Sequence, residues 1–353
     1  MKFICRSFLG FILALACTHP ACSQEKDSES GVQFVADVSG VGTNAAAFLE
    51  IGVGARAMAM GGAYGAVAND ASALYWNPAG IAWVDRPQCE LMHNEWLVDT
   101  NYEFAGFVLP VASIRSTFGF SLITLDYGKE AVRTVDRPEG TGETFTGRDL
   151  AIALSYGIAF TDRFSFGLSG KFINERIWSE TSTAAAIDVG VFYSTLLKGL
   201  KLGACVNNFG SKLELRGRRL RTVVDPDPSV TNFDRVPVNY KTGVYPLPLL
   251  FRVGVSYEKT IGSFSQVLFA LDVNHPSNTT ESVNLGMECG FADMFFLRGG
   301  YAGLFERDAI NGLTLGGGVD LVRRGRMGIR IDYSWSDWGV LENAQRFSLG
   351  LIF

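Results

Sequence analysis

The segment 345–353 alternates between polar or small side chains and apolar ones, and the sequence ends on an aromatic residue. Because successive side chains of a strand point to opposite faces, one face of this segment is purely apolar. That face carries Phe347, Leu349, Leu351 and Phe353. We expect this strand to close a transmembrane β-barrel of the outer membrane, with Phe353 as the signal for barrel assembly.

The same alternation recurs from Gln88 onward, with apolar and polar faces of similar length. Ile329 and Ile331, for example, alternate with Arg330 and Asp332. We predict an all-β fold of about fourteen strands, each near the roughly 9–11 residues that cross a membrane at a tilt. The predicted strands are about 88–96, 101–111, 115–126, 147–160, 163–176, 183–195, 199–208, 248–258, 263–274, 281–291, 294–302, 311–322, 326–335 and 344–353.

The connections between these strands differ systematically in length. Those after even-numbered strands are short, such as 161–162, whereas 127–146 and 209–247 are long. The connections after the fifth, ninth, eleventh and thirteenth strands are intermediate in length. Among the connections after odd-numbered strands, only the first one, 97–100, is short. Outer-membrane barrels have short periplasmic turns and longer external loops. We therefore expect both termini in the periplasm.

Composition narrows the class of protein further. A net charge of -5 and a pI of about 5.4 give no basic surface for nucleic acid. Charged residues are 19% of the chain, fewer than the polar outside of a large soluble barrel would need. After residue 24 no apolar run approaches the roughly 20 residues of a spanning helix, so strands are the expected membrane element.

The start of the chain is expected to be processed. Residues 1–23 have the charged start, apolar stretch and small-residue site of a signal peptide, with cleavage before Gln24. A lipoprotein signal that uses Cys17 or Cys22 is the alternative, although neither has Leu at the expected position. Residues 24–47 are polar and small, which indicates a periplasmic lead-in. The barrel itself is expected to occupy residues 87–353.

Residues 48–86 have no sustained period of two. They are rich in Ala, Gly and Met, too small-sided for a lipid-facing strand and too apolar for a linker. Short close-packed helices inside the lumen fit this composition. Asp70 is a candidate N-cap for a helix from Ala71 to Tyr75, which Asn77 and Pro78 would end.

This segment resembles the opening signature of the PorV/PorQ family of outer-membrane proteins, which are relatives of the FadL long-chain fatty-acid channel. The matching sequence is FLEIGVGARAMAMGGAYGAVANDASALYWNPAGIA, Phe48–Ala82. Its motifs are G-A-R-A-x-x-M-G-G-A, N-D-A-S-A and N-P-A-G, which contain Arg56, Gly61, Gly62, Asp70, Asn77, Pro78 and Gly80. The resemblance implies a fourteen-stranded barrel with this segment as a hatch in its lumen.

The resemblance also implies a function. PorV-like members serve type IX secretion, where they receive cargo from the translocon and help attach it at the cell surface. The alternative is a FadL-like passive channel for hydrophobic small molecules, and a third hypothesis is an envelope protein without transport. The expected partners are outer-membrane lipid and the barrel assembly machinery, with a type IX translocon or cargo protein under the first hypothesis and a hydrophobic small molecule under the second.

Charged residues of both signs fall on the inward faces of the predicted strands. They could form a polar path or a ligand site, but unpaired buried charge is costly. We therefore favour mutual ion pairs and anchors for the hatch, with Arg56 and Asp70 as partners of wall residues. The inward set is Lys171, Asp188, Arg252, Asp272, Glu288, Arg298, Asp320, Arg330, Asp332 and Arg346.

No motif indicates catalysis, a cofactor or a metal. A Ser-His-Asp site needs a histidine, and the two outside the signal, His93 and His275, lie in a strand and at a loop edge. Cys89, Cys205 and Cys289 are expected to be unpaired. The tryptophans near strand ends are expected in an interfacial girdle: Trp76, Trp96, Trp178, Trp335 and Trp338. Loop 209–247, with basic residues at 216–221, is either a solvated loop or a docking surface.

Overall fold

The computed structural model describes residues 40–226, 236–262, 264–306, 309–321 and 327–353. The predicted signal peptide, 1–23, and most of the predicted lead-in, 24–47, lie outside these residues. Within them, no helix is long and apolar enough to cross a membrane.

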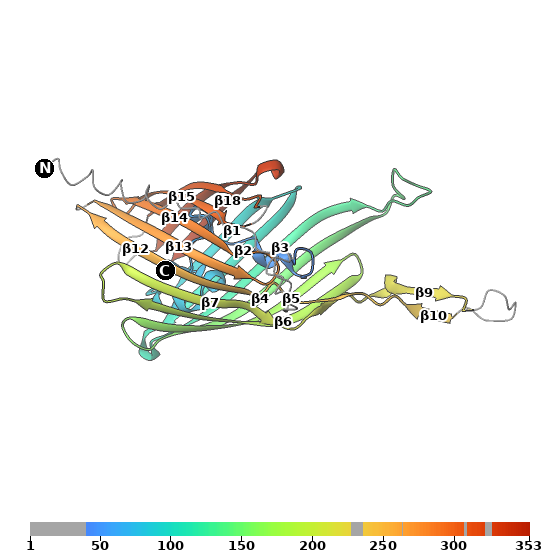
Figure 1. The fold of residues 1–353 in the computed structure, drawn as a ribbon, viewed down its shortest axis with the longest axis horizontal. Helices are drawn as coiled ribbons and strands as arrows, with labels where there is room; N and C mark the ends of the chain where they lie inside the picture. Colours follow the sequence, from blue (N-terminus) through green and yellow to red (C-terminus); the bar gives the residue numbers. More distant parts are fainter. Residues whose placement is uncertain (1–39, 227–235, 263, 307–308, 322–326) are drawn as a thin grey trace, which may run out of the picture. The chain divides into compact units, whose positions relative to one another are not determined.

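Fourteen antiparallel strands form one closed barrel, as the sequence predicted (Figure 1). The last strand closes the barrel on the first, with Phe347 opposite His93 and Leu351 opposite Cys89. The barrel strands are β1 (Gln88–Trp96), β2 (Thr100–Val111), β3 (Ser116–Ala131), β4 (Thr144–Ala159), β5 (Phe164–Ile177), β6 (Glu180–Ser194), β7 (Leu200–Gly210), β12 (Leu250–Ile261), β13 (Ser265–Pro276), β14 (Ser282–Phe291), β15 (Phe295–Leu304), β16 (Leu313–Asp320), β17 (Gly328–Asp337) and β18 (Asn343–Ile352).

Alternation along each strand separates an apolar outer face from a mostly small or polar inner face. On β3, the outward-facing Phe118 and Phe120 are 48% and 43% exposed, whereas the inward-facing Ser121 is 5% exposed. Other outward residues such as Leu154, Phe172 and Phe269 are equally exposed. Exposing so much apolar surface to water would cost about 25 cal/mol per Å². The outer face therefore suits contact with lipid.

The connections follow the predicted alternation with two corrections. The link between β5 and β6 is only residues 178–179, not an intermediate loop, because both strands extend further than predicted. Loop 209–247 contains short strands of its own: β8 (Leu213–Glu214) pairs with β11 (Val244–Tyr245), and β9 (Arg221–Val224) pairs with β10 (Val236–Asn239). Short 3-10 helices also occur, η4 (Ala112–Ile114), η5 (Arg218–Leu220) and η6 (Gly339–Leu341). The predicted turn 323–325 lies outside the described residues.

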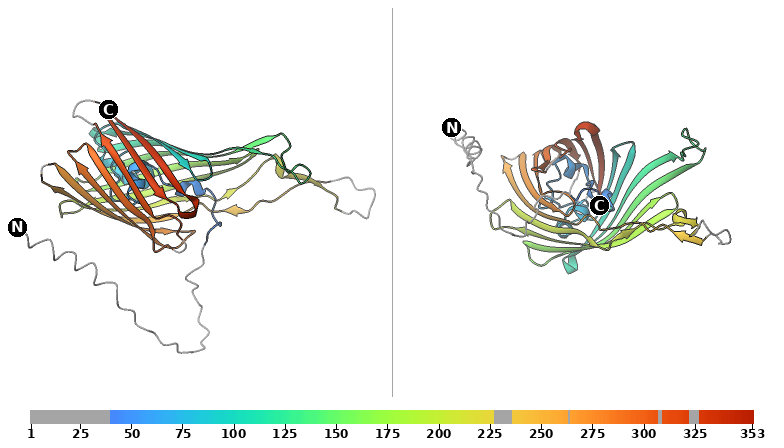
Figure 2. Two further views of the ribbon diagram at one scale, coloured as in Figure 1. Left: turned by 90° about the horizontal axis from the view of Figure 1, so that it is seen from above. Right: turned by 45° about the vertical axis from the view of Figure 1, so that its right-hand side comes forward.

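Short helices fill the lumen, as the composition of residues 48–86 predicted (Figure 2, right). They are η2 (Ala47–Glu50), α1 (Ala55–Ala59), α2 (Ala73–Trp76) and η3 (Pro78–Trp83). We call residues 47–83 the hatch. Asp70 does not cap α2, whose N-cap is Ser72; its carboxylate instead accepts hydrogen bonds from the Ser72 backbone and hydroxyl, at 3.1 and 2.6 Å. Asn77 ends α2, as predicted.

Candidate functional site

The hatch runs through the barrel from one end to the other. At the end that carries the long loops, Ala46 N donates to Glu175 Oε1 at 2.7 Å. At the opposite end, Phe353 N donates to Pro87 O at 2.9 Å, just after the hatch. The described part of the predicted lead-in, residues 40–47, therefore lies at the end away from Phe353. This corrects the expectation that it lies at the same end as the C-terminus.

Glycines on the inner wall let the hatch approach the strands closely. A Cβ on Gly157 would lie 2.6 Å from Ile81 Cγ1, and one on Gly286 would lie 2.6 Å from Met60 O. Contacts this short leave no room for a side chain, so these strands touch the hatch through backbone. We call the following residues the glycine ring: Gly119, Gly157, Gly167, Gly190, Gly203, Gly254, Gly286, Gly300 and Gly316.

The glycines of the hatch motif serve the same close approach from inside. Gly61 has a φ of +66°, and a Cβ there would lie 2.8 Å from both Leu285 O and Tyr301 N. Gly62 has a φ of +73°, and Gly80 would collide with Ala68 O if it carried a side chain. Glycine is therefore required at these motif positions by the close packing of the hatch against β14 and β15 and against other parts of the hatch.

Asn77 and Pro78 also have structural roles. The Asn77 side chain is fully buried, donates to Gly65 O at 2.9 Å and accepts from Ala79 N at 3.1 Å. Pro78 opens η3, where a missing backbone N–H costs nothing. The amide of Asn77 also donates to Val191 O of β6 at 3.1 Å, which joins this turn to the wall.

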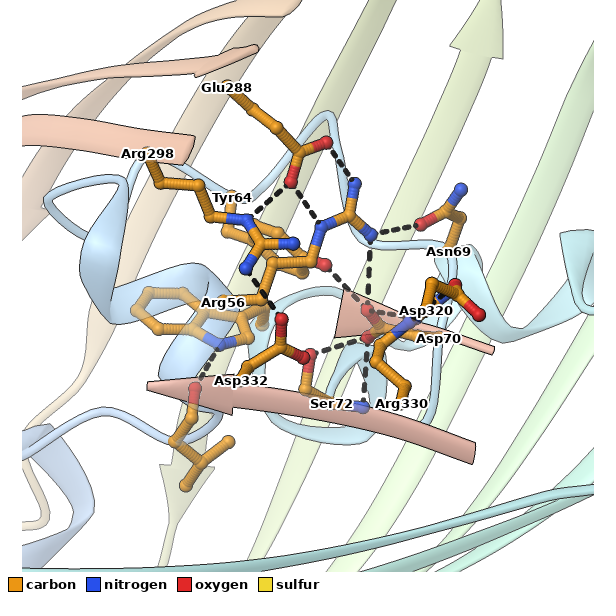
Figure 3. Close-up of polar contacts among 12 residues, drawn as sticks. Arg56, Tyr64, Asn69, Asp70, Ser72, Glu288, Arg298, Asp320, Arg330 and Asp332 are labelled. Carbon is orange, nitrogen blue, oxygen red and sulfur yellow. Dashed lines mark hydrogen bonds and ion pairs between the residues drawn. The ribbon is translucent and has the colours of Figure 1, made fainter. Parts of the chain in front are cut away.

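One part of the inner wall, formed by β12 to β18, carries an ion-pair network that binds the hatch (Figure 3). Arg56 holds Glu288 through two bonds of 2.8 Å. Arg298 donates to Glu288 at 2.6 Å and to Asp332 at 2.5 Å. Bidentate, charge-assisted contacts of this kind are the strongest that side chains make. The favoured prediction of mutual pairs and hatch anchors therefore matches what the structure shows here.

Asp70 extends this network on the hatch side. Its carboxylate lies 3.3 Å from Arg56 and 3.6 Å from Arg330, and it accepts the hydroxyl of Tyr64 at 2.6 Å. Burial alone would raise the pKa of Asp70, but Arg56 and Arg330 outweigh it and hold the pKa below its usual value. Arg330 also pairs with Asp320 at 2.8 Å. Sequence reasoning missed Tyr64 and Ser72, which no charge pattern marks.

Two further pairs of predicted lumen-facing residues lie elsewhere in the wall. Lys171 pairs with Asp188 at 2.6 Å, where both side chains are buried. Asp272 lies 3.8 Å from Arg252 and accepts the backbone N–H groups of Tyr64 and Gly65 at 2.9 and 2.7 Å. Of the basic residues in the predicted set, Arg346 alone has no carboxylate partner in the described residues. Its Nη1 donates to Ser336 Oγ at 3.2 Å.

The opposite part of the inner wall, from β1 to β6, has no ion pair with the hatch in the described residues and contacts it through apolar packing and a few hydrogen bonds, such as Trp83 Nε1 to Ser165 Oγ at 2.9 Å. Leu74 of α2 and Ile81 of η3 belong to one buried cluster with these strands. The residues of that cluster on β1 to β6 are Met92, Tyr102, Phe104, Val108, Ile123, Leu125, Ala151, Ile173, Ala184 and Ala186, and Leu268 and Ala270 of β13 also belong to it. The described ion pairs of the hatch with the wall thus lie on one side, and the other side holds the hatch through apolar packing and hydrogen bonds.

Two hollows lie near this assembly. A depression of 530 Å³ on the outer wall crosses β17, β18, β1, β2 and β3 and is mostly apolar, with Leu91, Leu122 and Phe347 in its lining. The exposed pair His93–Glu103, 2.6 Å apart, also lines it. A polar cavity of 260 Å³ is lined by residues of the short-turn end, such as Asp293, together with Arg56.

The described part of the chain contains neither a candidate metal site nor a disulfide bond. No group of His, Cys, Asp and Glu there is arranged to hold a metal ion. Cys89, Cys205 and Cys289 are free, and Cys205 is buried, donating to Trp76 O at 3.2 Å. The predicted aromatic girdle is wrong for Trp76, which is buried in the hatch, and for Trp96, whose ring packs edge-on against Trp338 at 4.9 Å.

Comparison with known proteins identifies relatives of the fold. A model described as "Uncharacterised protein family (UPF0164)" matches residues 20–146. No curated protein matches the chain. Among solved structures, the toluene transporter TodX of Pseudomonas putida is 14% identical, covers 85% of this chain and 96% of its own, and has a TM-score of 0.50.

Two other solved structures are similar to the same extent. The toluene transporter TbuX of Ralstonia pickettii is 13% identical, with coverage of 85% and 97% and a TM-score of 0.51. The CymD monoaromatic hydrocarbon channel is 12% identical, with coverage of 86% and 97% and a TM-score of 0.54. At these identities the likeness concerns the fold. The fourteen-stranded barrel that the sequence implied is therefore supported, whereas the relation to FadL and membership of the PorV/PorQ family stay predictions.

Proposed function

We propose that this chain is an outer-membrane barrel that admits hydrophobic small molecules, the alternative that the sequence raised. The observation that carries the proposal is the two-sided lumen: the hatch is ion-paired to β12–β18, whereas it contacts β1–β6 through apolar packing and a few hydrogen bonds. The shared fold with two toluene transporters and a monoaromatic hydrocarbon channel supports it. The short-turn end would face the periplasm.

The two sides of the hatch define a mechanism. Separating Arg56 from Glu288 leaves buried charges unpaired, which is strongly unfavourable. Separating Leu74 or Ile81 from the β1–β6 wall costs only apolar contact, which an apolar ligand replaces. A hydrophobic molecule would therefore pass between the hatch and the β1–β6 wall while the charged side stays fixed.

A pair of engineered disulfides tests this mechanism. In the Ile81→Cys/Gly157→Cys variant the two Cβ atoms would be at most roughly 4 Å apart, within the range of disulfides. This bond locks the apolar side of the hatch. The matched control is Ala66→Cys/Gly254→Cys on the charged side, where the two Cβ atoms would be 3.3 Å apart, near the lower end of that range. Both variants carry Ser in place of Cys89, Cys205 and Cys289.

Toluene uptake by intact cells is the measurement. We expect the apolar-side lock to abolish uptake in oxidising medium and a reductant to restore it, while the charged-side lock leaves uptake unchanged. Undiminished uptake with both locks would refute the proposed path. Loss of uptake with both locks would show that the whole hatch must move. Heat-modifiable migration on gels confirms in each case that the barrel is assembled.

A role in type IX secretion is the second candidate, and one observation favours it. Val224, Val236 and Val238 lie on one face of the β9–β10 hairpin and are 38–45% exposed. An apolar face presented by an exposed loop suits contact with another protein. The partner would be a translocon component or a cargo protein.

Substitution of these three valines by Thr tests that role. Threonine keeps the β-branched shape that strands favour and makes the face polar. We expect fewer cargo molecules at the surface of cells that possess a type IX system, with toluene uptake unaffected. The control is Val223→Thr on the other face of β9. Unchanged cargo display in the triple variant would exclude the hairpin face from secretion.

A further inference from the structure

Arg346 on β18 is buried with no solvent exposure, and it is the largest fully buried side chain of the described residues. Its Nη1 donates to Ser336 Oγ at 3.2 Å, but its Nη2 has no hydrogen-bond partner. The other buried arginines of the lumen, such as Arg298 and Arg252, reach carboxylates. A buried guanidinium without a carboxylate partner is a strongly unfavourable arrangement unless something else supplies the negative charge.

The residues beside Arg346 offer more unused hydrogen-bonding atoms. Ser334 on β17 lies directly across from Arg346, and Asn94 on β1 lies across on the other side, followed by Tyr102 on β2. These four inward-facing residues form one row across adjacent strands. The hydroxyls of Ser334 and Tyr102 are buried and have no partner in the described structure.

The guanidinium of Arg346 points toward the long-loop end of the barrel, because its partner Ser336 lies one inward row nearer that end. There its Cζ lies 5.3 Å from the centre of the Trp96 ring, which packs on Trp338 at 4.9 Å. The indole Nε1 of Trp338 is also buried without a partner. An indole N–H can only donate.

We propose that Arg346 is the centre of a binding site for a small monovalent anion. The unpartnered guanidinium and indole N–H groups can only donate, and the hydroxyls of Tyr102 and Ser334 can do so as well. This set suits an acceptor with negative charge rather than a cation. The proposed ion is small, such as chloride or formate, because the Arg346 side chain is fully buried. The site does not depend on the proposed transport function.

The full-length protein in mild detergent provides the first test. Its thermal unfolding is followed by heat-modifiable gel migration in sodium chloride, in sodium formate and in sodium gluconate, at equal ionic strength. A ligand that binds only the folded state raises Tm with its concentration. We expect a rise that grows with the logarithm of the chloride concentration and reaches roughly 3–5 °C at chloride 100-fold above its dissociation constant. Formate should act in the same way if the site takes carboxylates, and gluconate should have no effect. Equal Tm values in all three salts would overturn the proposal.

The Arg346→Met variant separates anion binding from a merely structural role. It removes the buried charge together with the centre of the site, so we expect its Tm to be independent of chloride. In gluconate it should melt no lower than the unmodified protein, whereas in chloride it should melt lower. Lys171→Met is the matched control, because Lys171 is buried but paired with Asp188. It should melt lower in every salt and keep the chloride response.

Two conservative variants and one direct measurement complete the test. Tyr102→Phe and Trp338→Phe each remove one polar group while retaining an aromatic ring, and each should shift the chloride response to higher concentration if that group binds the ion. Crystals of the unmodified protein grown in bromide should show an anomalous peak within hydrogen-bond distance of Arg346 Nη2. A bromide map without that peak, or a chloride response that persists in Arg346→Met, would refute the site.

Discussion

At the scale of single residues, the fit of the hatch inside the barrel depends on glycines of the inner wall, which have no side chain. The glycine ring allows the hatch to lie directly on the strand backbones, and any Cβ at these positions would collide with hatch atoms. Protein interiors are close-packed, so such collisions cannot be absorbed by empty space. These positions therefore require glycine because the hatch packs against them, and not because the strands themselves need it.

Two glycines of β5 provide a matched pair for this idea. Gly167 faces the hatch at Pro78 and Ala79, whereas Gly170 has no atom within 4 Å of a built Cβ. We expect Gly167→Val to destabilise the protein by about 1–3 kcal/mol through overpacking. Gly170→Val should be nearly neutral. Urea unfolding in lipid vesicles measures both, and similar losses in the two variants would disprove the role of the ring.

At the scale of elements, the hatch is the segment on which the lumen is organised. Its helix α1 lies against β15 to β18 and carries Arg56, whereas α2 and η3 lie against β3 to β6. Asp70, in the segment between α1 and α2, pairs with Arg56. Because few of these helices exceed one turn, they have little stability of their own. Their conformation depends on the wall, and their attachment depends on the ionisation of Asp70.

The pKa of Asp70 predicts how this attachment responds to acid. Because Arg56 and Arg330 hold the folded-state pKa below the usual value, the stabilisation is complete above the unfolded-state pKa of roughly 4. It is lost as the pH falls through the lowered folded-state value. The melting temperature should therefore not change between pH 7 and pH 5 on account of Asp70.

The Asp70→Asn variant isolates this contribution. We expect it to cost about 1.5–3 kcal/mol at pH 7, the range for hydrogen bonds to charged groups. The difference from the unmodified protein should shrink below pH 4. Asp162→Asn is the control, because Asp162 forms an exposed pair with Arg115 that should be worth less than about 1 kcal/mol. A difference that is constant down to pH 3 would contradict the assignment.

At the scale of the whole molecule, the barrel is a closed wall around a packed interior. Val53, Tyr64, Leu74 and Ile81 of the hatch are almost completely buried, so the hatch is closely packed in the lumen. We expect the full chain to give no steady ion conductance in planar lipid bilayers. A variant in which residues 47–83 are replaced by a short flexible linker should give stable open channels. Open channels from the unmodified protein would show that the hatch does not seal the lumen.

The sequence predicted this architecture because strand alternation and connection length are local signals. The strand count and the inward set of charges follow from a period of two, and the hatch follows from its composition. Which charges pair was not predictable, because Arg56 and Glu288 are far apart in the chain and meet only through the closure of the barrel. For the same reason, the sequence could not predict that Arg346 has no carboxylate partner in the described residues. The glycine ring could have been found from glycines that recur at inward positions of successive strands.

The course of the hatch has a consequence for how the molecule is built. Residues 46 to 87 pass through the barrel from the long-loop end to the end that holds Phe353. A segment threaded in this way can be enclosed without passing through either mouth if the wall is wrapped around it. The hatch precedes β1 in the chain, and the seam between β1 and β18 joins the two ends of the wall. Assembly would then finish by zipping this seam over an interior that is already in place, so that folding of the hatch becomes a condition for closing the barrel.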